Sequence, residues 1–333
     1  MKQAHRTAPA PRASWKRADL HMHTSFSGWR SLRLIDAQDC YVPPDRAYEV
    51  ARRLGMDFVC FTDHDTIDGA LDFLGRHPEA EPDVIVGEEV ETRFPDSTQW
   101  IHVNVFGVDE CLHDDIIRLR SNCFELIDEL RERNVLFALN HPFQSFGSCR
   151  AAERHLTEIL PLFPAIEVSS STSPRCHREI LETMLRDGGL RNLACVGGSD
   201  AHTATRIGAV HTLAPAGTKT EFLENIRRGI CAIDGSSQGL GSLLRDVYHI
   251  IGLYHRRLYL EPHPLGRRRK LVNLVSSGVL LPATLLGVPA LLTTAKYARQ
   301  QWIARIGPWG RHDLRRAAQP LPISERSSED RPA

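Results

Sequence analysis

The sequence has no excess of charge of either sign. Its 41 Lys and Arg residues are balanced by 41 Asp and Glu residues, and only 7% of its residues are aromatic. A chain without net positive charge has no general attraction for a phosphate backbone, and few aromatic side chains leave little for base stacking. The composition therefore does not favour a long nucleic-acid-binding track.

The eight cysteines include no C-x-x-C pair, and residues 1–17 contain no apolar segment typical of a secretory signal. Scattered cysteines in a chain of this size indicate reduced thiols that pack as small apolar residues in a reducing compartment. We therefore expect a cytoplasmic protein. Its residues 1–17, which are basic and rich in Pro and Ala, are expected to form a flexible tail.

Short apolar runs alternate with longer amphipathic ones between residues 18 and 235. An apolar content of 42% and a charged content of 25% are ordinary for a globular domain. Seven strands alternating with helices predict a parallel α/β arrangement, for which an open sheet and a closed barrel are both compatible. The predicted strands are 18–21, 58–62, 84–90, 101–106, 135–139, 165–168 and 193–196, and one long helix is predicted over 116–133.

The character of the chain changes after residue 235, where "SSQGLG" is typical of a linker. Residues 236–310 are predicted to form a helical extension, and 311–333 a disordered tail. Residues 271–295 contain no charged side chain, are preceded by the basic run 267–270, and are long enough to cross a bilayer core. They also contain Asn273 and prolines at 282 and 289. Two interpretations therefore stay open: membrane contact, or a broken helical hairpin packed on the main domain.

Imidazoles and carboxylates lie within or directly after the predicted strands. Because the carboxyl ends of parallel strands meet on one face, these groups are expected to share one pocket. The His-x-His spacing of residues 21 and 23 directs both rings to the same side of an extended strand. These groups are Asp19, His21, His23, Asp63, His64, Asp65, Glu88, Glu89, Glu91, His102, His141, Glu167, Asp200 and His202.

Eight such groups are more than a single tetrahedral zinc ion needs. Two or three divalent ions would use them all, and a mixed imidazole and carboxylate set without thiolate suits Zn, Mn or Fe. Clustered divalent ions lower the pKa of a bridging water and neutralise attacking and leaving oxygens, most usefully at phosphorus.

Five ordered segments carry a family resemblance: "DLHMHTSFS", "GMDFVCFTDHDTIDGA", "VIVGEEVET", "LNHPF" and "GGSDAHT". Through them the sequence resembles the polymerase-and-histidinol-phosphatase (PHP) family of metal-dependent phosphoesterases. The resemblance covers residues 18–203 and implies a distorted seven-stranded (β/α) barrel followed by the helical extension. It also implies eight metal ligands, with Glu89 as the bridging carboxylate: His21, His23, His64, Glu89, His102, His141, Asp200 and His202. Among them, Glu89, His64, Asp200 and His202 are the predicted catalytic residues.

One departure concerns the loop after the first motif. Many relatives have Asp where this chain has Gly28, so a ligand or general acid from that loop lacks its counterpart. For substrate binding, Arg206 is the best phosphate clamp because a guanidinium binds two phosphate oxygens at once. Arg30 and Arg33 lie in the long 24–43 connection, whose length is typical of a functional loop. Each arginine could equally be a plain surface residue.

Three further acidic residues lie close to the predicted ligands. Asp63 and Asp65 flank His64 and could orient it or cap the following helix. Glu167 faces the same pocket and could be a structural hydrogen-bonding residue.

These observations predict a hydrolase in which a metal-bound hydroxide attacks the phosphorus of a phosphomonoester or phosphodiester. A small phosphorylated metabolite or a nucleotide is the expected substrate. One alternative is a nuclease with the same mechanism. Another is a metal-binding domain without turnover, whose carboxyl-terminal part docks to a membrane or to a partner. The protein is expected in the cytoplasm, with membrane association through 271–295 as the open alternative.

Overall fold

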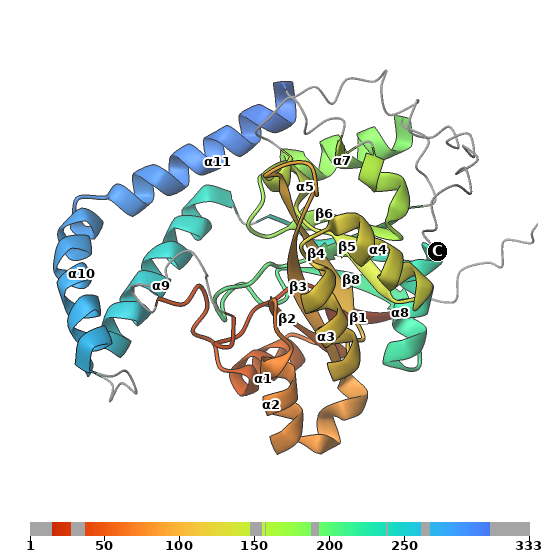
Figure 1. Ribbon diagram of the computed structural model, residues 1–333, viewed down its shortest axis with the longest axis horizontal. Helices are drawn as coiled ribbons and strands as arrows, with labels where there is room; N and C mark the ends of the chain where they lie inside the picture. Colours follow the sequence, from red (N-terminus) through yellow and green to blue (C-terminus); the bar gives the residue numbers. More distant parts are fainter. Residues whose placement is uncertain are drawn as a thin grey trace, which may run out of the picture.

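A computed structural model describes residues 15–27, 37–146, 155–156, 158–187, 193–237, 239–260 and 267–306. Within these residues nine strands form one sheet in the order β7-β6-β5-β4-β3-β2-β1-β8-β9, with helices arranged around its outside (Figure 1). The strands are β1 (Trp15–Asp19), β2 (Phe58–His64), β3 (Val84–Arg93), β4 (Trp100–Phe106), β5 (Leu136–Leu139), β6 (Ala165–Ser170), β7 (Ala194–Gly198), β8 (Val210–Pro215) and β9 (Ala232–Gly235).

The sheet bends into a nearly closed barrel, because contacts link β7 back to the β1 side of the sheet. Met22, just after β1, forms a parallel bridge with Ala201, just after β7. The Gly197 N–H donates to the Thr212 hydroxyl over 2.9 Å, and that hydroxyl donates to the Gly197 carbonyl over 2.8 Å. The predicted α/β barrel with a helical carboxyl-terminal extension is thus confirmed.

The sheet is mixed, so the prediction of parallel strands throughout is wrong. Strand β4 runs antiparallel to both β3 and β5. The 94–99 connection is too short for a crossover, which needs about a dozen residues, and it makes a hairpin instead. In that hairpin Phe94 N–H donates to the Gln99 carbonyl over 3.0 Å. The reversal places His102, near the start of β4, at the same rim as the carboxyl ends of the parallel strands.

Two strands are additional to the seven predicted ones. Strand β8 pairs antiparallel with β1, and β9 pairs antiparallel with β8. Strand β9 has only four residues and is mostly exposed, so it lacks the apolar pattern by which a strand is found in a sequence.

The helices cover the barrel and extend beyond it. They are α1 (Pro44–Arg53), α2 (Asp68–Arg76), η3 (Pro78–Asp83), α3 (Glu110–Leu119), α4 (Cys123–Glu132), α5 (Pro142–Ser145), η4 (Leu160–Leu162), α7 (Cys176–Asp187), α8 (Lys219–Arg227), α9 (Gly239–Leu260), α10 (Arg267–Leu285) and α11 (Val288–Ile306). The single helix predicted over 116–133 is therefore two helices. Asn122 separates them, because its side chain accepts the Phe124 N–H and begins α4.

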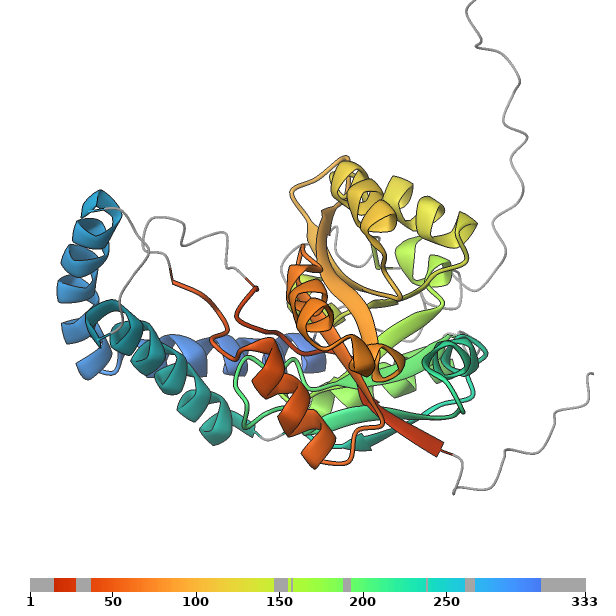
Figure 2. The ribbon, with the colours of Figure 1, turned by 90° about the horizontal axis from the view of Figure 1, so that it is seen from below.

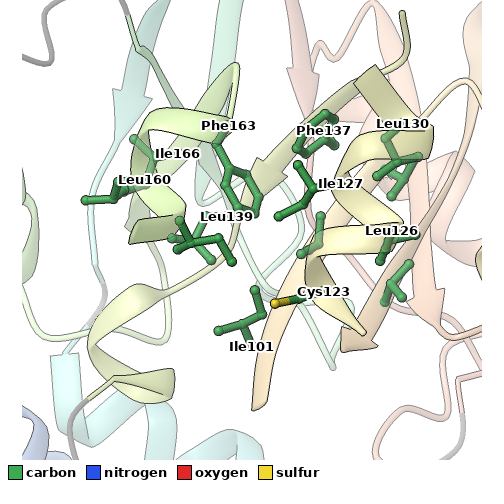
Figure 3. Close-up of a cluster of buried hydrophobic side chains, with 14 of the residues drawn as sticks. Ile101, Cys123, Leu126, Ile127, Leu130, Phe137, Leu139, Leu160, Phe163 and Ile166 are labelled. Carbon is green, nitrogen blue, oxygen red and sulfur yellow. The ribbon is translucent and has the colours of Figure 1, made fainter. Parts of the chain in front are cut away.

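The main core lies between α4 and the sheet. Leu126, Ile127 and Leu130 of α4 are buried among Phe137 and Leu139 of β5 (Figure 3). Burying each of these large apolar side chains is worth about 1.5–3 kcal/mol. This packing holds β5 in place and so fixes the position of the polar segment that follows it.

Helices α9, α10 and α11 form the carboxyl-terminal extension. α10 lies at the outer edge of the molecule, away from the barrel, whereas α11 returns toward α7 (Figures 1 and 2). Among the described residues no single helix is both long and apolar enough to cross a membrane. The segments Leu271–Leu285 and Val288–Arg305 satisfy that requirement only together, as a pair bent by 67°.

Asp246 of α9 joins the extension to the barrel. Its carboxylate pairs with the Arg206 guanidinium, and the two side chains are 11% and 1% exposed. The hydroxyls of Thr203 and Thr205 also donate to Asp246, over 3.2 and 3.3 Å. The loop after β7 is therefore tied to α9 by a buried charged network.

We expect the Asp246→Ala substitution to lower the free energy of unfolding by about 3–5 kcal/mol, because it leaves the buried Arg206 charge without its carboxylate. Glu224→Ala is the control, since its exposed pair with Arg228 and its partly exposed pair with Arg227 are each worth at most about 1 kcal/mol. Urea unfolding followed by circular dichroism measures both. Equal losses in the two variants would contradict the assignment.

Candidate metal centre

All eight predicted ligand residues lie together at one rim of the barrel. Three groups of side chains each have ligand atoms within 4.8 Å of one another. The groups are His21, His23 and Asp200; His21, Glu89 and His141; and His23, His64 and His202. The structure thus brings together strand ends that are almost 180 residues apart in the sequence, whereas metal ligation by these residues stays a prediction.

Glu89 of β3 lies at the middle of the centre. Its Oε1 is 3.3 Å from His21 Nε2, 3.2 Å from His102 Nδ1 and 3.0 Å from His141 Nε2. Its Oε2 is 3.4 Å from His23 Nε2 and 3.0 Å from His64 Nδ1. One buried carboxylate therefore contacts imidazoles from both of its oxygens, as a bridging ligand would.

Asp200 provides a second carboxylate on the β7 side. Its Oδ1 lies 3.6 Å from His21 Nε2, 3.5 Å from His23 Nε2 and 3.5 Å from His202 Nδ1. Its Oδ2 accepts a hydrogen bond from the Thr172 hydroxyl over 2.8 Å. The Thr172 contact fixes the plane of the carboxylate and leaves Oδ1 directed at the imidazoles.

Asp39 is a third carboxylate at the centre, and the sequence analysis missed it. Its Oδ2 lies 3.4 Å from His64 Nε2 and 3.7 Å from His202 Nε2, and its side chain is 10% exposed. The residue belongs to no recognisable motif. The available signal was indirect: Asp39 lies in the long 24–43 connection in which Gly28 replaces the expected Asp. The predicted departure at Gly28 is thus accompanied by a carboxylate supplied from further along the same connection.

The surroundings keep the two main carboxylates ionised. Burial alone would raise the pKa of Glu89, but the imidazoles of His21, His102 and His64 together lower that pKa well below its usual range. Burial acts in the same direction on Asp200, and the contacts with His21 and His23 again lower the pKa well below normal.

The histidines respond in opposite directions. Burial lowers the pKa of His23 to about 3, and the nearby His202 and His64 add to that effect. Burial also disfavours a charge on His102 and His202, but Glu89 outweighs it for His102, and Asp39 with Asp200 outweighs it for His202. The pKa of each of these two is raised to about 9. A proton is thus favoured on His102 and His202, beside the carboxylates, and disfavoured on His23.

Several buried polar atoms at the centre have no hydrogen-bond partner among the described residues. They are His21 Nε2, His23 Nε2, His141 Nδ1 and Asp39 Oδ1. A buried nitrogen or oxygen without a partner is costly unless something else contacts it. Imidazole nitrogens and carboxylate oxygens turned toward one another are the donor set that Zn, Mn and Fe bind, so the residues present fit a divalent metal cluster.

The backbone is unusual at the same place. Four described non-glycine residues have a positive φ, and Asp65 (51°), His141 (26°) and Asp200 (53°) are three of them. Such conformations cost of order 1–3 kcal/mol each and persist where the surrounding structure enforces them. Gly198, two residues before Asp200, lies so close to β1 that an added Cβ would be 2.3 Å from His21 Cβ. Close backbone approach at this point therefore depends on glycine.

A layer of buried acids orients the ligand residues. Glu167 Oε1 lies 2.9 Å from His21 Nδ1, and Glu167 Oε2 accepts the His141 N–H over 3.1 Å. Asp19 accepts the Ser199 N–H over 2.8 Å and so connects the ends of β1 and β7. The cavity-facing position expected for Glu167 agrees with these contacts.

The two acids that flank His64 have different partners. Asp63 accepts the Thr24 N–H and hydroxyl over 2.5 and 2.7 Å, which fixes the loop after β1. Asp65 accepts the Glu91 N–H and pairs with Arg120. Neither caps α2, whose first N–H, that of Asp68, donates instead to the Thr66 hydroxyl over 3.1 Å.

Arg206 does not have the environment of a phosphate clamp, and that prediction needs correction. Its side chain is 1% exposed and pairs with Asp246, and its Nη1 donates to the Ser171 carbonyl over 2.7 Å. A guanidinium held this way is a structural cation rather than an accessible anion-binding group. Arg30 and Arg33 lie outside the described residues, so their predicted contacts with substrate stay predictions.

Comparison with known families adds to this geometry. A family model described as "PHP domain" matches residues 19–199, more than half of the chain. A second, described as "PHP-associated", matches residues 190–231. An uncharacterised protein of Methanocaldococcus jannaschii is 29% identical over 135 residues, which is 40% of this chain and 71% of that protein.

Three solved structures match parts of this chain at low sequence identity. PsfC from Pseudomonas syringae is 19% identical, with a TM-score of 0.49 over 72% of this chain and 99% of its own. A Bifidobacterium adolescentis protein provisionally described as a metal-dependent phosphoesterase is 18% identical, with a TM-score of 0.40 over 64% and 94%. An amidohydrolase from Chromobacterium violaceum, with bound sulfate and no metal, is 14% identical, with a TM-score of 0.40 over 56% and 87%.

Metal binding at pH 7 is expected to release protons. His102 and His202, whose pKa is raised to about 9, carry protons at that pH, and an imidazole must be neutral to bind a metal. Metal affinity should therefore rise as the pH increases toward 9. Titration calorimetry with Mn²⁺ or Zn²⁺ in two buffers of different ionisation enthalpy measures the proton release. Identical binding enthalpies in both buffers would argue against it.

Proposed function

The chain belongs to the PHP domain family, and from this premise we propose that it is a metal-dependent hydrolase acting on phosphoesters. The substrate is proposed to be a phosphomonoester or phosphodiester of a small metabolite or nucleotide. The observation that carries the proposal is Glu89, a buried carboxylate with five imidazoles within 3.4 Å of its two oxygens. Such a group is costly to bury unless cations are shared around it.

The three ligand groups would hold two or three divalent cations. Glu89 and Asp200 would bind together with His21 and His23, and Glu89 also with His102 and His141. His64 and His202 would bind together with Asp39, whose Oδ2 lies between their rings. When bound, the cations would lower the pKa of water and neutralise the oxygens of a phosphoryl group.

The chain's own residues prepare this centre in three ways. Glu167 and Asp63 fix the ligand loops, so little reorganisation is needed on binding. The depressed pKa of Glu89 and of Asp200 keeps both carboxylates ionised at neutral pH.

The third contribution is that one side of the candidate metal centre is accessible to solvent. The side chains of His64, His102 and His202 are 18%, 15% and 24% exposed, whereas those of His21 and His23 are buried. We propose that substrate approaches past the three exposed rings. The zero net charge and few aromatic residues support a small substrate rather than a polymer.

The activity is tested with purified protein supplied with Mn²⁺, Zn²⁺ or Fe²⁺ and a panel of phosphomonoesters and phosphodiesters. We expect Asp200→Asn and His23→Ala each to lower kcat/KM by about 100-fold or more, since even outer residues of metal sites contribute 10- to 100-fold. His77→Ala is the matched control, because His77 is an exposed histidine paired with Asp45 outside the centre. Activity that survives both centre substitutions, or no activity on any panel member, would contradict the proposal.

Asp39 is tested separately by metal content. We expect Asp39→Asn to lower the number of bound metal ions per chain, because it removes the carboxylate shared by His64 and His202. Elemental analysis after dialysis measures this number, with Asp72→Asn on the surface of α2 as the control. An unchanged metal content in Asp39→Asn would show that Asp39 is not a ligand.

A further inference from the structure

The α10–α11 arm, residues 267–306, carries an exposed apolar surface that the proposed function does not use. Most of the large apolar side chains that are exposed within the described residues belong to this arm. The most exposed ones lie around the corner between the two helices, where Leu285, Leu286, Leu291 and Leu292 are 80%, 83%, 69% and 63% exposed. A contiguous apolar surface on a folded protein marks an interaction site.

In helix α10 polar side chains are buried and apolar ones are exposed, the reverse of a typical helix in a water-soluble domain. Its polar residues Asn273 and Ser277, one turn apart, are 1% and 0% exposed. Asn273 Oδ1 accepts from the Tyr254 hydroxyl over 3.1 Å, and Ser277 Oγ lies 2.7 Å from the Tyr259 hydroxyl. The polar stripe of α10 therefore faces α9.

The apolar residues of α10 face the other way. Leu271 and Val275, also one turn apart, are 63% and 62% exposed. In a soluble domain the apolar stripe of a helix faces the core and the polar stripe faces water. In a lipid environment, polar side chains join neighbouring helices and apolar ones face outward, which is the pattern of α10.

The charge distribution identifies the occupant of this surface. Residues 271–295 contain no charged side chain, and they lie between the basic run Arg267-Arg268-Arg269-Lys270 and Lys296. A protein interface has a polar rim around its apolar core, and residues 271–295 contain no charged side chain to form one. An apolar helical segment with basic residues at its ends is instead typical of attachment to a membrane with anionic lipids.

The bend decides between crossing a membrane and lying on it. The two helices meet at 67°, and Gly287 at the corner has φ +81°. The far end of α11 is fixed to the barrel, where Ile303 and Ala304 are buried and His177 Nε2 lies 3.2 Å from the Gln300 carbonyl oxygen. The arm therefore leaves the barrel and returns to it, which favours an arm that lies on a membrane over one that crosses it.

From these observations we propose that the α10–α11 arm binds the surface of a phospholipid bilayer that contains anionic lipids. The corner around Leu285 and Leu291 enters one leaflet, and residues 267–270 meet the head groups. Since Asp246 ties α9 to the loop after β7, the bound arm holds the metal centre at the membrane surface. This inference does not depend on the proposed hydrolysis.

Sedimentation with vesicles tests the proposal on the full chain. We use phosphatidylcholine vesicles with and without about 30% phosphatidylglycerol, at low and high salt. The wild type is expected to sediment with the anionic vesicles. The double variant Leu285→Glu/Leu291→Glu should bind at least about tenfold less, because its charges would enter the apolar layer.

Two further variants test whether binding depends on this apolar surface and on the basic residues next to it. Leu54→Glu changes an equally apolar side chain, 52% exposed just after α1, and should bind as the wild type does. Replacing residues 267–270 by Gln should remove the preference for anionic over neutral vesicles. Far-UV circular dichroism and thermal unfolding confirm that each variant is folded.

The proposal is overturned if the folded wild type sediments with neither vesicle, or if Leu54→Glu reduces binding as much as the double variant. Analytical ultracentrifugation without lipid tests the alternative that this surface binds a second copy of the chain. A dimer that the double variant dissociates, together with no vesicle binding, would assign this surface to a second copy of the chain.

Discussion

The structure depends on a single buried carboxylate, that of Glu89. Burying one ionised carboxylate is expensive unless positive charge lies beside it. Here five imidazoles from separate parts of the barrel surround it, and the raised pKa of His21 and of His102 lets these two rings carry the compensating positive charge, so the charge balance depends on the strands being in place. The fold and the site therefore depend on each other. The barrel places the imidazoles around Glu89, and the Glu89 carboxylate is the shared partner that these rings contact.

Around this interaction lies a layer of residues that contact the candidate ligands or the backbone next to them. Glu167 holds His21 and the His141 backbone, Asp63 holds Thr24, and Asp19 joins the ends of β1 and β7. His141 and Asp200 also have a positive φ, a strained backbone conformation that directs their side chains toward the other candidate ligands. The apolar core behind β5 supplies the free energy that keeps the strained loops in place.

The extension is joined to this system and is not a separate appendage. Asp246 contacts Arg206, Thr203 and Thr205, which follow His202 closely in the sequence. The helix that leads into the α10–α11 arm is thus also the support of the loop that carries two of the candidate ligands. Through this contact a surface at the outer edge of the molecule is mechanically connected to the candidate metal centre.

The sequence by itself determined the positions of seven strands and the residue types at their ends. Both are local properties: apolar runs mark strands, and groups such as His21 and Asp200 follow them directly. Strand direction is decided by pairing with distant neighbours, so the reversal of β4 and the existence of β9 emerged only in the tertiary structure. The same holds for Asp39, which no motif marks and whose place beside His64 and His202 only the structure shows. The burial of Arg206 and the inward-facing polar side chains of α10 likewise result from packing against α9. The local sequence around Arg206 or within α10 does not reveal this contact.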